Sequence, residues 1–118
     1  MSQIAGRLST HVLDTARGRP AAGLTLDLFF VMSDSRQHLA GFTTNDDGRT
    51  DAPLLTDDLE VGVFELVFHV GDYFVDLALP EPKFLDLVPV RFGVADKTQT
   101  YHVPLLVSPW SYSTYRGS

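Results

Sequence analysis

Apolar and polar residues alternate along most of this chain, and a period of two is typical of β-strands with one covered face. The clearest alternating stretch runs from Gly23 to Ser33. One of its faces consists of apolar residues only, namely Leu24, Leu26, Leu28, Phe30 and Met32. The opposite face includes Phe29 and Val31, which makes it too apolar for a surface in full contact with water. We expect that face to be covered or to face another subunit.

Further segments are predicted to be strands because they alternate or because they return the chain after a turn signal. In the first of them, Leu8 and Val12 share an apolar face, while Arg7, Ser9 and His11 share a polar face that we expect to point outward. Clusters of Gly, Pro, Asp and Asn separate the segments, as turns require. The predicted strands are residues 3–13, 38–43, 51–55, 61–70, 88–94, 98–106 and a closing strand after the Ser108-Pro109 turn.

One segment has a helical period instead. Gly71-Asp72 is a possible helix cap, and Phe74, Leu77 and Ala78 then recur at helical spacing until Pro80 and Pro82 end the pattern. The helix is therefore short, about two turns at most. Short strands, frequent turns and this one short helix predict an all-β fold, a two-sheet antiparallel β-sandwich that forms a single domain over residues 1–118.

Composition narrows the possible functions. The 118 residues suffice for one compact domain with a buried core. The chain has no cysteine, which excludes disulfides, thiolate zinc sites and a cysteine nucleophile. Its net charge of −6 argues against nucleic acid and anionic membrane as partners. Residues 1–7 have no apolar core of signal-peptide length, and no apolar run reaches membrane-spanning length, so we expect a cytoplasmic protein.

The candidate chemistry lies in histidine and arginine. The sequence has no Gly-x-Ser-x-Gly elbow, zinc-binding helix or glycine-rich phosphate loop, so we expect neither a metal nor a cofactor. We interpret His38 and His69 as ordinary surface or packed residues. His11 and His102 lie on the polar faces of predicted core strands, and Arg49 follows the tight Asp-Gly bend. Histidine and arginine without a nucleophile favour direct attack by water, with imidazole moving the proton and a cation stabilising the oxyanion.

The C-terminal segment is unusual. Most domains end in a few loosely held polar residues, whereas β-forming aromatic residues and a cation continue here almost to the last residue. We expect this segment to be held in place. It would then present Tyr115, Arg116, Ser118 and the terminal carboxylate at fixed positions.

Three sets of motifs identify a family. They are Leu8-Ser9-Thr10-His11-Val12-Leu13-Asp14 with Gly18-x-Pro20-Ala21, Thr43-Thr44-Asn45 with Asp47-Gly48-Arg49, and Tyr101-His102-Val103-Pro104-Leu105-Leu106 with the terminal Tyr115-Arg116-Gly117-Ser118. Together they closely resemble the transthyretin-like family, in its enzyme branch of 5-hydroxyisourate hydrolases. The terminal tetrapeptide is the most specific motif, because hormone-binding transthyretins lack it. The chain departs from the pattern at Thr100, where many relatives have a second histidine, and at residues 85–87.

This resemblance implies both an assembly and a reaction. It implies a homotetramer with active sites in a channel between dimers, and hydrolysis of 5-hydroxyisourate without a cofactor. The catalytic residues that it implies are His11, Arg49, His102 and Ser118, and the substrate-binding residues that we assign are Thr114, Tyr115, Arg116 and Gly117. Either histidine could be the general base; we favour His102, with His11 orienting. The alternative function is a non-catalytic carrier of a small aromatic ligand, of the transthyretin type.

Overall fold

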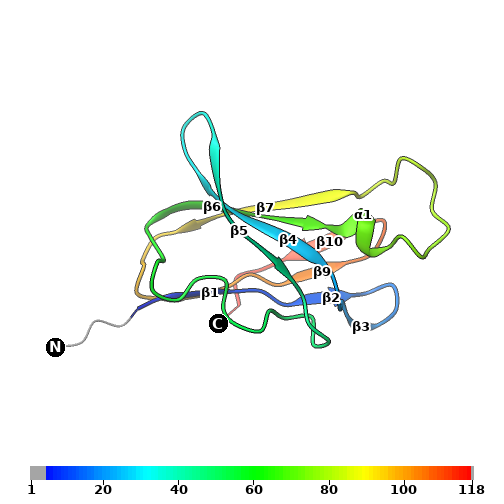
Figure 1. The fold of residues 1–118 in the computed structure, drawn as a ribbon, viewed down its shortest axis with the longest axis horizontal. Coiled ribbons are helices and arrows are strands. Elements are labelled where there is room, and N and C mark those ends of the chain that lie inside the picture. The colour runs from blue at the N-terminus through cyan, green and yellow to red at the C-terminus, as the bar shows by residue number, and fades with distance from the viewer. Residues whose placement is uncertain (1–4, 118) are drawn as a thin grey trace.

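The computed structural model describes residues 5–117, which form short strands around one turn of helix (Figure 1). The elements in chain order are β1 (Arg7–Ser9), β2 (Val12–Asp14), β3 (Arg19–Pro20), β4 (Thr25–Val31), β5 (Arg36–Thr43), β6 (Gly62–His69), α1 (Val70–Tyr73), β7 (Leu87–Val94), β8 (Thr100–His102), β9 (Leu105–Val107) and β10 (Tyr112–Thr114). The predicted all-β class with one short helix is therefore confirmed. Within residues 5–117, no helix is long and apolar enough to cross a membrane.

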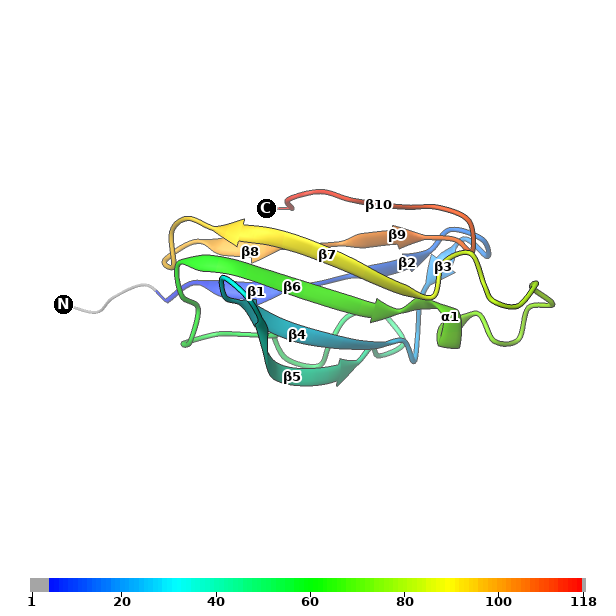
Figure 2. The same cartoon turned by 90° about the horizontal axis from the view of Figure 1, so that it is seen from above.

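The strands form two layers, which Figure 2 shows from above. One layer is the sheet β5-β4-β6-β7, and the other consists of β10-β9-β2-β3 together with the pair β1-β8. Apolar side chains from both layers fill the space between them, which confirms the sandwich and the inward face predicted for most strands. Met32 is an exception, because it lies beyond the end of β4 and is 44% exposed. The largest fully buried side chains are Phe64, Phe68, Phe74, Leu8, Leu24, Leu26, Leu28, Leu66, Leu105, Val12, Val70 and Val88.

Two pairings in the second layer are parallel, within a sandwich that we predicted to be antiparallel. β1 pairs with β8, and β2 pairs with β9, in parallel register. The reason is the connection between them: the chain leaves the second layer after β3, builds the whole of the other sheet, and returns to the second layer as β8 and β9. Antiparallel neighbours can be joined by a tight turn, whereas parallel neighbours need a long crossover of this kind. The β4-β5, β4-β6 and β6-β7 pairs are antiparallel, as predicted.

The first and the penultimate predicted strands are each interrupted. Residues 7–14 form β1 and β2, and residues 100–107 form β8 and β9, while the predicted start at Gln3 lies outside the described residues. Backbone bonding across the break continues, since the N–H groups of Val103 and Leu105 donate 2.9 Å hydrogen bonds to the carbonyls of Ser9 and His11. Pro104 lies between them and has no N–H to donate toward the opposite side of the strand. Opposite this break, the Thr10 hydroxyl donates a 2.7 Å hydrogen bond to the Val103 carbonyl and holds the two strand pairs together.

The predicted helix cap is wrong. The helix α1 begins at Val70 with His69 at the N-cap position, no side-chain hydrogen bond caps it, and Gly71 lies inside it. Close packing explains this glycine, since a Cβ atom there would lie 2.3 Å from Oδ1 of Asp86. The helix also ends after one turn, and Phe74 continues as a buried residue of the following turns.

Two smaller predictions have mixed outcomes. The strand predicted over residues 51–55 is reduced to one bridge between Leu55 and Leu8. The outer face of β4 is covered at Phe29, as predicted, and the cover comes from the same chain: the Arg36 guanidinium lies 3.9 Å from the centre of the Phe29 ring, and His38 meets the ring edge-on at 5.2 Å.

Candidate functional site

The second layer brings His11 and His102 to its outer side. His11 lies between β1 and β2, and its carbonyl accepts a 2.9 Å hydrogen bond from the Leu105 N–H. His102 is the last residue of β8, directly opposite Ser9 of β1. Both imidazoles are half-buried, whereas Tyr101, the neighbour of His102, points into the core. This agrees with the predicted outward placement of both histidines.

The ring of His102 is held on two of its edges. Its Nδ1 atom lies 2.8 Å from Oγ of Ser9. On the other edge, Gly117 packs so closely that a Cβ atom there would lie 2.6 Å from the Cδ2 atom of His102. The Gly117 N–H also donates a 2.7 Å hydrogen bond to the His102 carbonyl. Of the ring nitrogens, Nε2 is the one that neither contact occupies.

Arg49 is presented by a tightly organised loop. Gly48 has a φ of 75°, which favours glycine, and its carbonyl accepts a 2.8 Å hydrogen bond from the N–H of Val12, next to His11. Oδ1 of Asn45 accepts hydrogen bonds from the N–H groups of Asp47, at 2.9 Å, and Arg49, at 3.2 Å. The loop therefore fixes the backbone of Arg49 beside the strand that leads away from His11.

The three predicted residues are close enough to interact electrostatically. Burial is the main cause that lowers the pKa of His102 below its usual 6.5, and the positive charges of Arg49 and His11 lower it further. A lowered pKa means that the neutral imidazole is favoured at neutral pH. His102 is thus suited to accept a proton, and Arg49 supplies a nearby cation for a developing negative charge.

The C-terminal segment is held in place as far as Gly117. The strand β10 pairs with β9, and the Thr114 hydroxyl donates a 2.7 Å hydrogen bond to the Pro104 carbonyl. The guanidinium of Arg116 lies 4.3 Å from the centre of the Tyr101 ring and donates hydrogen bonds to Gln99 and Thr100. These contacts confirm that the terminus is ordered up to Gly117. Ser118 lies outside the described residues.

The predicted substrate-binding residues lie in two different places. Gly117 touches His102, whereas Thr114, Tyr115 and Arg116 line a cavity of about 210 Å³ between β7 and the terminal segment. Tyr101 and Val103, which are core-facing residues, line the same cavity. Within one chain, the side chain of Arg116 therefore lies on the core side of β8, whereas the ring of His102 lies on its outer side.

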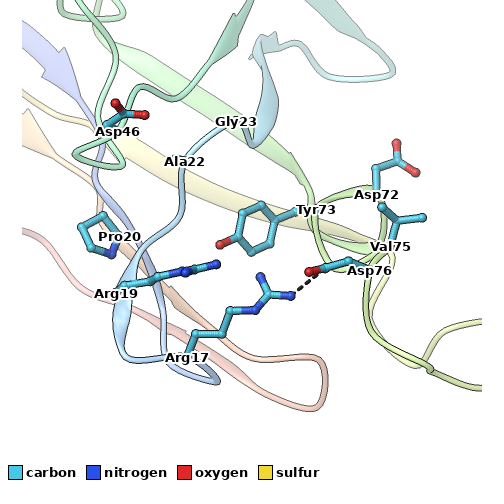
Figure 3. Close-up of a pocket in the computed structure, with 10 residues that line it drawn as sticks. All are labelled: Arg17, Arg19, Pro20, Ala22, Gly23, Asp46, Asp72, Tyr73, Val75 and Asp76. Carbon is cyan, nitrogen blue, oxygen red and sulfur yellow. Dashed lines mark hydrogen bonds and ion pairs between the residues drawn. The ribbon is translucent and has the colours of Figure 1, made fainter.

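Another hollow of the surface lies away from these residues (Figure 3). It has a volume of about 510 Å³ and contains none of the predicted site residues. Figure 3 shows Arg17 extended beside Tyr73 toward Asp76, to which it donates a 2.6 Å hydrogen bond. Arg17 also bonds to the buried Asp14, so its charge is already paired within the fold. The hollow is lined by Arg17, Arg19, Pro20, Ala22, Gly23, Asp46, Asp72, Tyr73, Val75 and Asp76.

The other two histidines have structural partners in the opposite sheet. Nε2 of His38 lies 2.8 Å and Nε2 of His69 lies 2.7 Å from the two carboxylate oxygens of Asp27. This agrees with our interpretation of both as ordinary surface residues. Among residues 5–117, no group of three or more histidine, cysteine or acidic side chains is arranged to hold a metal ion.

Sequence reasoning missed two residues that hold the site together. Ser9 and Asn45 make contacts with His102 and with the Arg49 loop, respectively. Ser9 could have been found from the alternation, because it shares the outward face of His11. Its pairing with His102 could not, since the parallel register of β1 and β8 is a property of the folded chain.

Comparisons with known proteins agree with this architecture. The model of the HIUase/Transthyretin family matches residues 8–117. A relative named 5-hydroxyisourate hydrolase 2, from Rhizobium meliloti, is 57% identical over 116 residues, which are 96% of this chain and 97% of the relative. The structure of Klebsiella pneumoniae 5-hydroxyisourate hydrolase aligns with a TM-score of 0.78 at 32% identity, over 95% of this chain and 99% of that one.

A larger protein contains the same unit. The crystal structure of an (S)-allantoin synthase aligns with a TM-score of 0.92 at 42% identity. The alignment covers 99% of this chain but only 45% of that one, so the chain spans less than half of the synthase. The family model and the full-length relative lead to the same conclusion. The chain belongs to the HIUase/Transthyretin family.

Proposed function

We propose that this chain hydrolyses 5-hydroxyisourate to 2-oxo-4-hydroxy-4-carboxy-5-ureidoimidazoline. The observation that carries the proposal is the setting of His102, which is half-buried on the outer side of the second layer with Oγ of Ser9 at 2.8 Å from its Nδ1. Its lowered pKa, to which Arg49 and His11 from two other segments contribute, supports the same role. Relatives with the hydrolase name at 57% identity support the same reaction. The substrate is a flat, polar and anion-prone ring, so an acidic protein needs a local positive lining of this kind to bind it.

The geometry supports attack by water. His102, neutral and with Nε2 free of the two contacts described, takes a proton from a water molecule, whose oxygen forms a bond to the acyl carbon of the ring. Arg49 stabilises the carbonyl oxygen as it gains negative charge, a contribution of about 3 kcal/mol by analogy with oxyanion donors. The ring C–N bond then breaks and its nitrogen takes up a proton. His11 orients the substrate, and no cofactor is needed.

Substitution of the histidines tests this assignment. His11→Ala and His102→Ala are each expected to slow hydrolysis by about 100-fold or more, as loss of an acid–base group does. The measurement follows the ultraviolet absorbance of substrate generated freshly by urate oxidase. His38→Ala is the matched control, because His38 lies on the opposite sheet. Hydrolysis at wild-type rate by both site variants would exclude this site.

A carrier of a small aromatic ligand is the competing function, since the same sandwich supports either role. The charged and hydroxylated terminal segment favours the enzyme, because a carrier needs an open apolar channel. Deletion of residues 115–118 distinguishes the two. Turnover disappears on deletion if these residues belong to the catalytic site, whereas a carrier gains affinity for aromatic ligands, which equilibrium titration measures.

We further propose that the chain assembles as a homotetramer. The strands β7 and β10 end their sheets, and edge strands offer unpaired backbone groups to a second copy. The exposed Leu87 on β7 and Tyr112 on β10 add apolar surface to these edges. Leu87→Lys is expected to lower the mass measured by light scattering, and Val75→Lys, at another exposed apolar residue, is expected to leave it unchanged. Equal masses for both variants would contradict assembly through β7. The cytoplasmic location stays a prediction.

A further inference from the structure

The hydroxyl group of Ser9 has a single described side-chain contact, and it is made with the candidate base. Oγ of Ser9 lies 2.8 Å from Nδ1 of His102. The two residues face each other across the parallel β1-β8 pair, and the Ser9 carbonyl accepts a 2.9 Å hydrogen bond from the N–H of Val103. The position of Ser9 relative to His102 is thus fixed by backbone hydrogen bonds on the same strands, rather than by a flexible loop.

This contact bears on which ring nitrogen carries the proton. A neutral imidazole has one N–H donor and one acceptor nitrogen, and the hydrogen bond at one nitrogen selects the tautomer. A serine hydroxyl can either donate or accept. If Ser9 donates, Nδ1 is the acceptor and Nε2 carries the proton, so Nε2 cannot take another from water. If Ser9 accepts, Nδ1 carries the proton and Nε2 is the base.

The surroundings of the ring favour the second arrangement. Gly117 covers the Cδ2 edge and Ser9 occupies the Nδ1 edge, which leaves the Nε2 edge for the substrate. Nε2 is therefore the ring nitrogen that can meet a water molecule, and a general base must present a lone pair there, which requires the proton to lie on Nδ1.

We propose that Ser9 is a positioning residue, whose hydroxyl accepts the Nδ1–H of His102 and thereby keeps Nε2 of His102 unprotonated toward the substrate. This inference rests on the proposed hydrolase function for its catalytic consequence. Its structural content, the tautomer of His102, does not depend on that function. Ser9 does not need to touch the substrate in this role.

Nuclear magnetic resonance of ring nitrogens tests the tautomer directly. In ¹⁵N-labelled full-length protein, at a pH where the imidazole is neutral, the chemical shift of each ring nitrogen reports whether it carries a proton. The His102 signals are assigned by their loss in His102→Gln. We expect a protonated Nδ1 in the wild type and in Ser9→Thr, which keeps the hydroxyl, and a protonated Nε2 in Ser9→Ala. A protonated Nε2 in the wild type would overturn the inference.

Enzyme kinetics test the catalytic consequence of the contact between Ser9 and His102. Ser9→Ala is expected to lower kcat about tenfold or more with little change in KM, since groups that orient a functional histidine act in this range, and Ser9→Thr is expected to recover most of it. Ser33→Ala, at an exposed serine between β4 and β5, is the matched control. A wild-type kcat in Ser9→Ala would overturn the positioning role. If the wild type shows no hydrolysis at all, the proposed function fails, while the ring spectra still decide the role of Ser9.

Discussion

Gly117 offers the sharpest structural test of the terminal segment. Replacement by alanine adds one methyl group whose carbon would lie 2.6 Å from Cδ2 of His102 and 3.1 Å from its Cβ and Cγ atoms. Ordinary van der Waals contact begins at 3.4 Å, so the imidazole or the terminal segment must move by about 0.8 Å. Gly117 does not have a positive φ, which means that backbone strain adds nothing to this effect.

The magnitude follows from the position of the clash. Misplacement of a catalytic group by about 1 Å costs about 100-fold in rate, which corresponds to about 2.7 kcal/mol in activation free energy. We therefore expect Gly117→Ala to lower kcat about 100-fold in the 5-hydroxyisourate assay, with a melting temperature close to that of the wild type because the segment is at the surface.

The matched control is Gly93→Ala, since a Cβ atom at Gly93 would have no neighbour within 4 Å. Light scattering first checks that both variants have the same assembly mass as the wild type, because Gly93 lies on the edge strand β7. If Gly117→Ala keeps the wild-type kcat and KM, Gly117 does not pack against His102 in the active enzyme, and the reasoning is refuted.

Three more predictions concern other parts of the fold. The pKa of His102 is lowered in the folded chain, so an unfolded chain binds more protons as the pH falls through 6.5, and this residue reduces stability toward acid. For the same reason the acidic limb of kcat/KM, which reports the free enzyme, lies below 6.5. Denaturation and kcat/KM measured across pH test both, and an acidic limb above 6.5 would contradict the shift. Asn45→Ala removes the acceptor for two N–H groups of the Arg49 loop, so we expect a loss of about 1 kcal/mol in unfolding free energy and a fall in kcat/KM; unchanged kinetics would show that the loop holds Arg49 without it. Hydrogen bonds from His38, and then from His69, lower the pKa of Asp27, so its stabilisation is present at neutral pH and is lost as the pH falls through that lowered pKa. Asp27→Asn should cost about 1 kcal/mol by chemical denaturation and leave hydrolysis unchanged.

Alternation along the chain was sufficient to predict the two faces of most strands. Leu24, Leu26 and Leu28 are fully buried, as their spacing indicates. The same pattern placed His11 and His102 on an outward face. These are properties of single strands, which local periodicity determines.

The pairing of distant strands could not be predicted in this way. The parallel register that sets Ser9 opposite His102 depends on a crossover through the whole of the other sheet. Alternation also continued through residues 10–11 and 103–104, where the two predicted strands are interrupted, and Pro104, which has no N–H, lies at the second of these breaks. Periodicity responds to side chains, and the missing N–H of proline belongs to the backbone.

The terminal segment shows a further limit of prediction from the sequence alone. Its sequence predicted that it is held in place, and the contacts of Arg116 with Tyr101, Gln99 and Thr100 agree with that. The direction of each side chain depends on the close approach of Gly117 to His102 and on the cavity beside β7. Such approaches involve residues 15 or more positions apart, which no local pattern encodes.

The most direct test of the central claim is the rate at which purified protein consumes fresh 5-hydroxyisourate. Urate oxidase generates the substrate, and its absorbance is followed with and without the protein, because the substrate also decays spontaneously. We predict that the decay accelerates in proportion to protein concentration and that His102→Ala removes most of this acceleration. A decay rate equal to that of the protein-free control would contradict the account.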